Sequence, residues 1–286
     1  MNHFGRRLRA AIDAYGPLCV GIDPHSHLLT QWGLDASAAG AREFGLRVVE
    51  AAAGRVGIIK PQVAFFERHG SAGYRALEDV LAAGRAAGLI VIADAKRGDI
   101  GSTMDGYAAA WLTPGSPLEA DAVTLSPYLG AGSLHDTVML AVDAGKGAFV
   151  LAATSNPEAV SLQTAVTADA RGGETVAARV VRDIVRLHRS ASVATADAEL
   201  APIGFVVGAT VDRRAAGLDD DTLRGAPILA PGFGAQGAEP ADLEKLFGTL
   251  SAQVVANESR SILSAGPAGL SRAIEVRAAA YAGTRG

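Results

Sequence analysis

Eight short apolar runs, each followed by polar, glycine or proline residues and then by a helical segment, constrain the fold of this chain most strongly. The runs are Leu18–Ile22, Val56–Ile59, Leu89–Ala93, Ala122–Leu125, Ala148–Ala152, Ile203–Val207, Pro227–Ala230 and Gln253–Ala256. Strands that are apolar on both faces are typical of parallel sheets covered by helices. Eight such units within about 250 residues of this 286-residue chain predict an α/β fold, a (β/α)8 barrel.

The segments between the runs carry the spacing of amphipathic helices. Two stripes show it, namely Phe44, Val48 and Ala52, and Leu77, Val80, Leu81 and Gly84. A doubly wound open sheet is the alternative, but it usually has a glycine-rich turn after its first strand. Asp23-Pro24-His25 follows the first run here, which favours the barrel.

No shift in composition marks a second domain, so we expect a single barrel domain over residues 1–286. The longest connection, around 157–202, should hold one helix at Thr175–Arg189. The polar stretch Ser190–Glu199 that follows is predicted to be a surface excursion.

Charge and cysteine content exclude several classes of protein. A formal net charge of -4 without a run of like charges argues against a nucleic-acid partner. The single cysteine, Cys19, lies in an apolar run and is predicted to be a core residue. Asp13 interrupts the N-terminal segment before a signal-peptide core could form, and no 18-residue apolar stretch exists. We therefore expect a soluble cytoplasmic protein with no membrane partner.

The segment that follows the third run is the strongest candidate for chemistry. Asp94 and Lys96 are two positions apart, so they should project from the same face of a strand, and Asp99 follows closely. A carboxylate and an ammonium group held together can fix each other's ionisation and move a proton. The alternative is a solvated turn with a local ion pair.

Charged groups at the ends of other strands favour a reaction site over a solvated turn. Asp23 follows the first run, Lys60 the second and Thr154-Ser155-Asn156 the fifth. In a (β/α)8 barrel these ends meet at one face, where active sites lie. The glycine-rich segment Pro231–Gly237, together with Arg260 after the eighth run, matches the phosphate site that barrels build there.

These elements together resemble the orotidine 5'-phosphate decarboxylase family over about residues 17–265. The motifs that carry the resemblance are Asp23, Lys60, Asp94-x-Lys96-x-x-Asp99, the loop Ala230–Gly237 and Arg260. Three further segments resemble the longer bacterial subgroup (type 2), namely Asp99–Thr103, Lys60–Gln62 with Phe65–Glu67, and Thr154–Pro157. The fifth-strand segment departs from the shorter subgroup.

The resemblance implies decarboxylation of orotidine 5'-phosphate to UMP, without metal or cofactor, on a homodimeric barrel. It implies that Lys96 protonates C6 of the pyrimidine, that Asp94 lies beside the substrate carboxylate, and that Lys60 and Asp99 complete a charge network. The further implied contacts are ribose at Asp23 and Lys60, the base at Ser155, and phosphate at Gln236 and Arg260 within the loop that begins at Pro231. Asp99 and Thr103 are expected to enter the site from the partner subunit.

Two other hypotheses compete with this one. A metal-dependent sugar-phosphate decarboxylase or aldolase would place an acidic ligand where this chain has Lys60, and a lysine there repels a divalent cation. A catalytically silent nucleotide-binding protein would lose Lys96 while keeping Arg260, and both are present. His25 and His27 lack a matching third ligand, so we expect a structural or surface role for them and no metal site.

Overall fold

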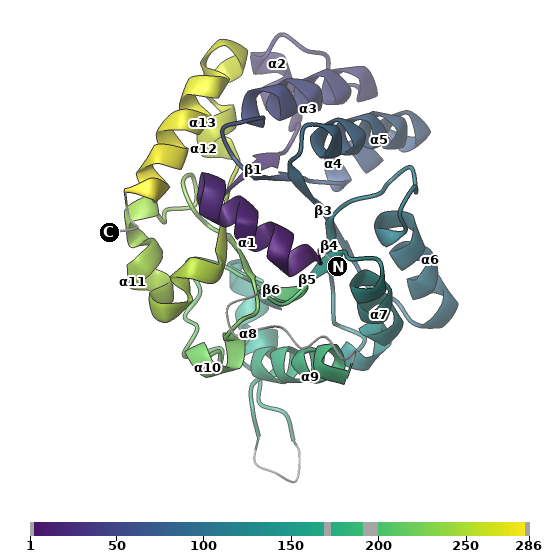
Figure 1. Cartoon of the computed structure of the whole chain (residues 1–286), viewed down its shortest axis with the longest axis vertical. Coiled ribbons are helices and arrows are strands. Elements are labelled where there is room, and N and C mark those ends of the chain that lie inside the picture. Colours follow the sequence, from purple (N-terminus) through teal and green to yellow (C-terminus); the bar gives the residue numbers. More distant parts are fainter. Residues whose placement is uncertain (1–2, 169–172, 191–199, 284–286) are drawn as a thin grey trace.

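The strands of the chain close into a parallel barrel in a computed structural model that describes residues 3–168, 173–190 and 200–283 (Figure 1). The strands follow one another in chain order around the barrel, so each pairs with its neighbours in the sequence. They are β1 (Leu18–Ile22), β2 (Ile58–Pro61), β3 (Ile90–Arg97), β4 (Ala122–Leu125), β5 (Gly147–Ala153), β6 (Ile203–Val207), β7 (Ile228–Pro231) and β8 (Val254–Glu258). The predicted (β/α)8 barrel is confirmed.

Helices surround the barrel and connect its strands (Figure 1). The α-helices are α1 (Phe4–Tyr15), α2 (Ser26–Gln31), α3 (Ala38–Ala52), α4 (Ala64–Glu67), α5 (Gly70–Ala86), α6 (Gly101–Leu112), α7 (His135–Asp143), α8 (Val160–Gln163), α9 (Val176–Ser190), α10 (Asp220–Leu223), α11 (Leu243–Phe247), α12 (Arg260–Leu263) and α13 (Gly266–Ala282). The 3-10 helices are η1 (Ala131–Leu134), η2 (Pro157–Ala159), η3 (Pro240–Asp242) and η4 (Gly248–Gln253). Both apolar stripes predicted from the sequence are buried, on α3 and α5.

The predicted strand positions hold for β1, β4 and β6, whereas β2 and β3 differ in a way that matters for the site. Strand β2 is shifted by two residues because its pairing with β1 extends to Lys60 and Pro61. Strand β3 continues through Asp94 to Arg97. The candidate charged residues Lys60, Asp94 and Lys96 therefore belong to strands rather than to the loops after them.

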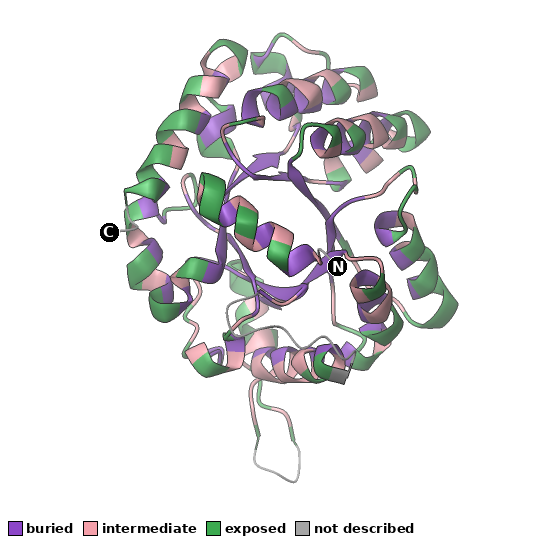
Figure 2. Cartoon of the chain, viewed as in Figure 1, coloured by how far each residue is buried: buried purple, intermediate pink, exposed green. Residues whose placement is uncertain are grey.

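Alternate strand residues point into the barrel and fill it. The buried cluster inside holds Cys19, Ile58, Ile92, Phe149, Leu229 and Val255, whereas the intervening residues pack against the helices. The strands are buried throughout most of their length and the outer faces of the helices are exposed (Figure 2). Burial raises the pKa of the Cys19 thiol to about 12, which agrees with its predicted place in the core.

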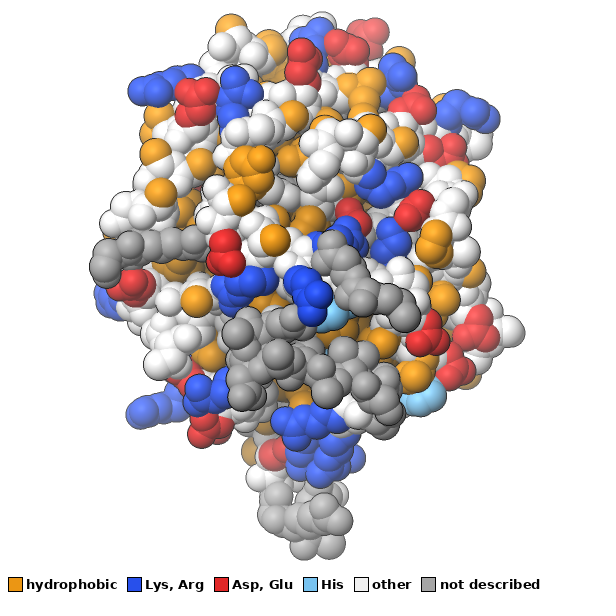
Figure 3. All heavy atoms as spheres, in the orientation of Figure 1, with side chains coloured by type: hydrophobic (Ala, Val, Ile, Leu, Met, Phe, Trp, Pro, Cys, Tyr) orange, Lys and Arg blue, Asp and Glu red, His pale blue; other side chains and the backbone are white. Residues whose placement is uncertain are grey.

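Helix α1 closes the amino-terminal end of the barrel, and Figure 1 shows it lying across the centre of that face. Its apolar side places Phe4, Leu8 and Ile12 in the barrel interior. Arg7 donates to Asp121 over 2.6 Å, which ties α1 to the start of β4. Basic and acidic side chains intermingle on this face (Figure 3). These contacts anchor the helix and leave the opposite end of the barrel as the open one.

The longest connection runs between β5 and β6. Its predicted helix Thr175–Arg189 is observed one residue later, as α9. An antiparallel bridge between Val166 and Thr175 precedes α9. The predicted excursion after this helix falls on residues 191–199, outside the described residues. No helix in the described ranges is long and apolar enough to cross a membrane.

Candidate active site

A cavity of about 320 Å³ lies at the carboxyl ends of the barrel strands. The last inward-facing residues of the strands line it, and these residues are polar on one half of the barrel and apolar on the other. Strands β1 to β4 supply polar and charged groups. Strands β5, β6 and β7 supply Leu151, Val206 and Leu229. The cavity thus has one charged wall and one apolar wall.

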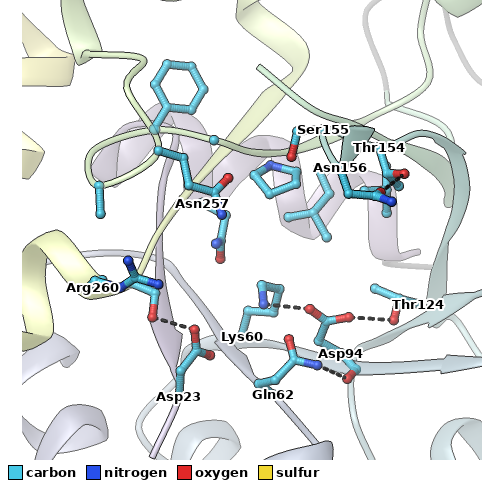
Figure 4. A pocket seen from close by; sticks show the side chains of 18 of the residues that line it. Asp23, Lys60, Gln62, Asp94, Thr124, Thr154, Ser155, Asn156, Asn257 and Arg260 are labelled. Atoms are coloured by element: carbon cyan, nitrogen blue, oxygen red, sulfur yellow. Dashed lines mark hydrogen bonds and ion pairs between the residues drawn. The ribbon is translucent and has the colours of Figure 1, made fainter. Parts of the chain in front are cut away.

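Asp94 forms the centre of the charged wall, where it binds two ammonium groups; Figure 4 shows its contacts with Lys60 and Thr124. Lys60 Nζ lies 2.7 Å from Asp94 Oδ2, and Lys96 Nζ lies 2.6 Å from Oδ1. Thr124 donates its hydroxyl to Oδ1 over 2.9 Å. Lys60 and Asp94 are buried, whereas the Lys96 side chain is 46% exposed. Lys96 is therefore the ammonium group that a ligand in the cavity can reach most easily.

The pKa shifts of the buried pair follow from this arrangement. Burial alone would raise the pKa of the Asp94 carboxyl, but Lys60 and Lys96 outweigh burial and hold that pKa well below its usual range. Burial also opposes the charged form of Lys60, yet Asp94 and Asp23 raise its pKa overall. Both groups are consequently ionised at neutral pH.

The backbone of Lys96 is in the left-handed region, with φ of +48°. No other non-glycine residue in the described ranges has a positive φ. The pairing of β3 with β4 shifts register between Ala93 and Arg97. This bulge removes the Lys96 N–H from the ladder, and it donates instead to Thr124 Oγ1 over 2.9 Å. Thr124 thereby fixes both the backbone of Lys96 and the carboxylate that Lys96 binds.

A second group of polar residues faces this wall from the residues that follow β1 and β8 and from the start of α12. Ser259 donates to Asp23 Oδ2 over 2.5 Å, while Asp23 Oδ1 is buried without a partner among the described residues. Figure 4 shows Asp23 and Arg260 on one side of the cavity and Asp94 and Thr124 on the other. Ligand groups of both kinds, hydroxyl donors and anions, fit between them.

The loop after β7 lines the cavity with Pro231, Gly232 and Gln236. It folds back on itself, since the Gly234 N–H donates to the Ala238 carbonyl over 2.7 Å. Gly234 has φ of +68°, and a Cβ atom there would come within 2.7 Å of Glu258 Oε2. Only glycine therefore allows the loop to lie this close to β8.

Glu258 supports this loop from outside the barrel. Its side chain is completely buried and accepts hydrogen bonds from Arg277 over 2.7 Å, from Tyr281 over 2.8 Å and from Ser261 over 2.7 Å. Arg277 also binds Glu239, at the far end of the loop, over 2.9 Å. Helix α13 contacts both ends of the segment that carries Gln236, since Tyr281 also packs against Phe233 with ring centroids 5.8 Å apart.

The segment after β5 reaches the cavity through Thr154, Ser155 and Asn156. Thr154 donates to Asn156 Oδ1 over 2.7 Å, and Gln163 binds both the N–H and the hydroxyl of Thr154. The Ser155 side chain makes no hydrogen bond with the described residues and lies at the upper edge of the cavity in Figure 4.

The structure brings eight of the predicted site residues to one cavity. They are Asp23, Lys60, Asp94, Lys96, Ser155, Pro231, Gln236 and Arg260. Asp99 and Thr103 do not line it; they lie at the start of α6, where Thr103 is exposed. Ile100, which follows Asp99 in the chain, is an exposed apolar residue, as are Tyr128 and Leu129 after β4.

Other residues also line the cavity, among them four polar ones for which no role in binding or catalysis was predicted: His25, Gln62, Thr124 and Asn257. His25 forms part of the cavity wall and its ring packs on Phe65 with centroids 4.1 Å apart, so the expected structural or surface role of this residue stays a prediction. Gln62 and Thr124 lie two positions after Lys60 and Ala122, on the same strand face, and this period of two could have identified them.

No group of three or more potential metal ligands occurs in the described part of the chain.

The chain has the site of a (β/α)8-barrel enzyme. Carboxylate and ammonium groups face each other beside a glycine-rich loop, at the carboxyl ends of the eight strands. The family described as Orotidine 5'-phosphate decarboxylase / HUMPS matches residues 16–270. The chain therefore belongs to the orotidine 5'-phosphate decarboxylase / HUMPS family.

Individual relatives agree with this assignment. Orotidine 5'-phosphate decarboxylase of Streptomyces coelicolor is 51% identical over 268 residues, which cover 93% of this chain and 92% of that protein. The enzyme of Salinispora arenicola is 49% identical over 267 residues, with the same coverage. A Streptomyces avermitilis crystal structure, provisionally described as an orotidine 5'-phosphate decarboxylase, is 47% identical and superposes with a TM-score of 0.90. That match covers 99% of this chain and 96% of the other.

Proposed function

We propose that this chain decarboxylates orotidine 5'-phosphate to UMP in pyrimidine biosynthesis, with neither a metal ion nor a cofactor. The observation that carries the proposal is the Asp94 carboxylate bound between Lys60 and Lys96 on the charged wall of the cavity. In this reaction the bond from C6 to the carboxylate breaks, carbon dioxide leaves, and the electron pair stays on C6. Lys96 then gives C6 a proton, so the product has hydrogen where the substrate had the carboxylate.

The distribution of polar groups around the cavity supports one orientation of the substrate. The phosphate binds at Gln236 and Arg260, because a guanidinium group and an amide beside glycine-rich backbone suit its oxygens. Asp23 and Lys60 contact the ribose hydroxyl groups. Ser155 faces the pyrimidine, whose C6 lies at Lys96.

Electrostatics explains why the lysine would serve both as a cation and as an acid. A carbanion formed without a cofactor needs a fixed positive charge nearby, and an ammonium group supplies that charge together with a proton. Asp94 with Lys60 and Lys96 carries one net positive charge, which complements the carbanion at C6. The ionised Asp94 also lies next to the departing carboxylate.

One ion pair is too weak to account for catalysis. Two unit charges about 4 Å apart interact by roughly 4 kcal/mol at an effective dielectric near 20, whereas enzymes lower barriers by about 8–23 kcal/mol. Binding energy from the remote phosphate must contribute as well. We therefore propose that the loop 231–240 closes over the phosphate and orders the charged wall.

The active form is proposed to be a homodimer in which Asp99 and Thr103 enter the partner's site. Their position outside the cavity of their own subunit supports this, as does the exposed apolar side chain of Ile100, which lies between them in the chain. Asp99 would complete the alternating charge network with Lys60, Asp94 and Lys96. We also place the chain in the longer bacterial subgroup of the family, on the motifs after its second, third and fifth strands.

The direct test is the loss of orotidylate absorbance on addition of purified protein that has been dialysed against EDTA. Activity equal to that of untreated protein is expected. Absence of turnover in both preparations would reject the proposed activity. Turnover that stops on chelation and returns with a divalent cation would reject the metal-free mechanism.

A further inference from the structure

Asn257 presents an unused hydrogen-bond donor to the cavity. The residue lies on β8 and is 9% exposed, and its Oδ1 atom is buried without a hydrogen-bond partner in the described part of the chain. The Nδ2 atom also has no hydrogen-bond partner among the described residues, but unlike Oδ1 it is not buried. The carboxamide nitrogen is therefore the end of the side chain that a ligand can reach.

This amide destabilises the fold, because its Oδ1 atom is buried without a hydrogen-bond partner among the described residues. A buried carbonyl oxygen without a partner is unfavourable, and native proteins keep few such groups outside functional sites. Neither Pro231 of β7 nor Cys19 of β1, which pair with Asn257 in the barrel, has a side chain that could satisfy it. An apolar residue would fill this position without the penalty.

The position of β8 in the barrel indicates which part of a nucleotide the amide meets. In a closed barrel of eight strands, β7 and β8 lie opposite β3 and β4. Figure 4 shows the same relation, with Asn257 and Arg260 on one side of the cavity and Asp94 and Thr124 on the other. A pyrimidine nucleotide carries C6 and the 2-carbonyl group on opposite sides of N1. With C6 at Lys96, the 2-carbonyl group points toward β7 and β8.

We infer that Asn257 is a substrate-binding residue whose Nδ2 atom donates a hydrogen bond to the 2-carbonyl oxygen of the pyrimidine. The inference rests on the proposed function, because it takes C6 to lie at Lys96. It also agrees with the other walls of the cavity: Asp23 after β1 lies on the ribose side of the ring, and Ser155 after β5 lies opposite, near C4. The amide thus helps to select a base with an acceptor at this position.

The experiment compares UMP with 2-thio-UMP, whose sulfur is a weak acceptor, by calorimetric titration of the intact protein. Wild type should bind UMP about fivefold more tightly than 2-thio-UMP, as one hydrogen bond allows. In N257A the two affinities should become equal. N257D keeps the shape of the side chain but replaces Nδ2 by oxygen, and should lose the preference as well.

Val255→Ala is the matched control, because Val255 lies on the same strand and face, buried below the cavity. This variant should lose stability yet keep the fivefold preference. A preference that survives in N257A or N257D would overturn the inference and assign the 2-carbonyl contact to another donor, such as Gln236. Wild-type protein that turns over orotidylate but shows no preference would overturn it too. Protein without turnover or UMP binding would instead reject the proposed function beneath it.

Discussion

Lys60 and Asp94 form an ion pair of 2.7 Å in which both side chains are almost completely removed from solvent. Neither charge could remain buried alone, since the cost of taking one ion out of water is several kcal/mol. Lys96 binds the second oxygen of the same carboxylate. Asp94 therefore has a structural task in addition to its proposed place beside the substrate.

The first prediction concerns the stability of the buried pair. Asp94→Asn leaves Lys60 as an uncompensated buried charge, so the free energy of unfolding in urea at pH 7 should fall by about 3–5 kcal/mol. Asp79→Asn is the control, because the pair of Asp79 with Arg42 is exposed and should contribute less than about 1 kcal/mol. Similar losses in the two variants would contradict a special role for burial.

A second prediction follows from the sign of the pKa shifts. The pKa of Asp94 is lowered by folding, so its contribution to stability is present above its unfolded pKa of about 3.9 and disappears as the pH falls. The pKa of Lys60 is raised by folding, so its contribution is present below about 10.4 and disappears as the pH rises further. The contribution of this pair to the stability of the wild type should therefore be constant from pH 5 to 9 and fall at both extremes. Urea unfolding measured at each pH would contradict the assignment if the free energy of unfolding changed steadily with pH through pH 7.

The third prediction separates chemistry from binding. Lys96→Ala should lower kcat by at least about 10³-fold, because it removes both the proton donor and the cation nearest C6. UMP binding should persist, since the phosphate and ribose contacts remain. Lys245→Ala removes the same charge from an exposed position on α11 and should leave kcat unaltered. A Lys96→Ala enzyme with near wild-type kcat would show that another group protonates C6.

The proposed shared site gives a fourth prediction. Lys96→Ala and Asp99→Ala should each be nearly inactive, yet unfolding and refolding them together should restore about a quarter of wild-type activity, because half of the symmetric dimers then hold one intact site. Mixing Lys96→Ala with Asp94→Asn is the control. Those two defects belong to the same subunit's site, so the mixture should stay inactive. Equal activity in both mixtures would mean that Asp99 serves its own subunit.

Much of the fold could be predicted because apolar runs and barrel geometry are local and regular. Asp94 and Lys96 were placed on one strand face from their spacing alone, and the structure confirms this. The end of β8 was missed, since its apolar run stops at Ala256 and nothing local indicates that Glu258 is buried. Its burial depends on Arg277, which lies 19 residues away on α13.

The cavity itself was predicted less completely than the strands. Charged residues at strand ends pointed to it, and most of them line it. Asn257 and His25 gave no such signal, because a neutral amide or imidazole is equally common on a surface. Their place becomes visible only when closure of the barrel brings β8 and α2 to the same opening as β3.

The left-handed backbone of Lys96 has a consequence for how this protein could be improved. Glycine adopts that conformation freely, whereas a lysine there is strained. Selection for thermal resistance alone would favour glycine at position 96, and selection for turnover would oppose it. A residue with a strained backbone is thus one that the proposed reaction requires. Mutations that raise the stability of this barrel without loss of activity will have to be made at other positions in the chain.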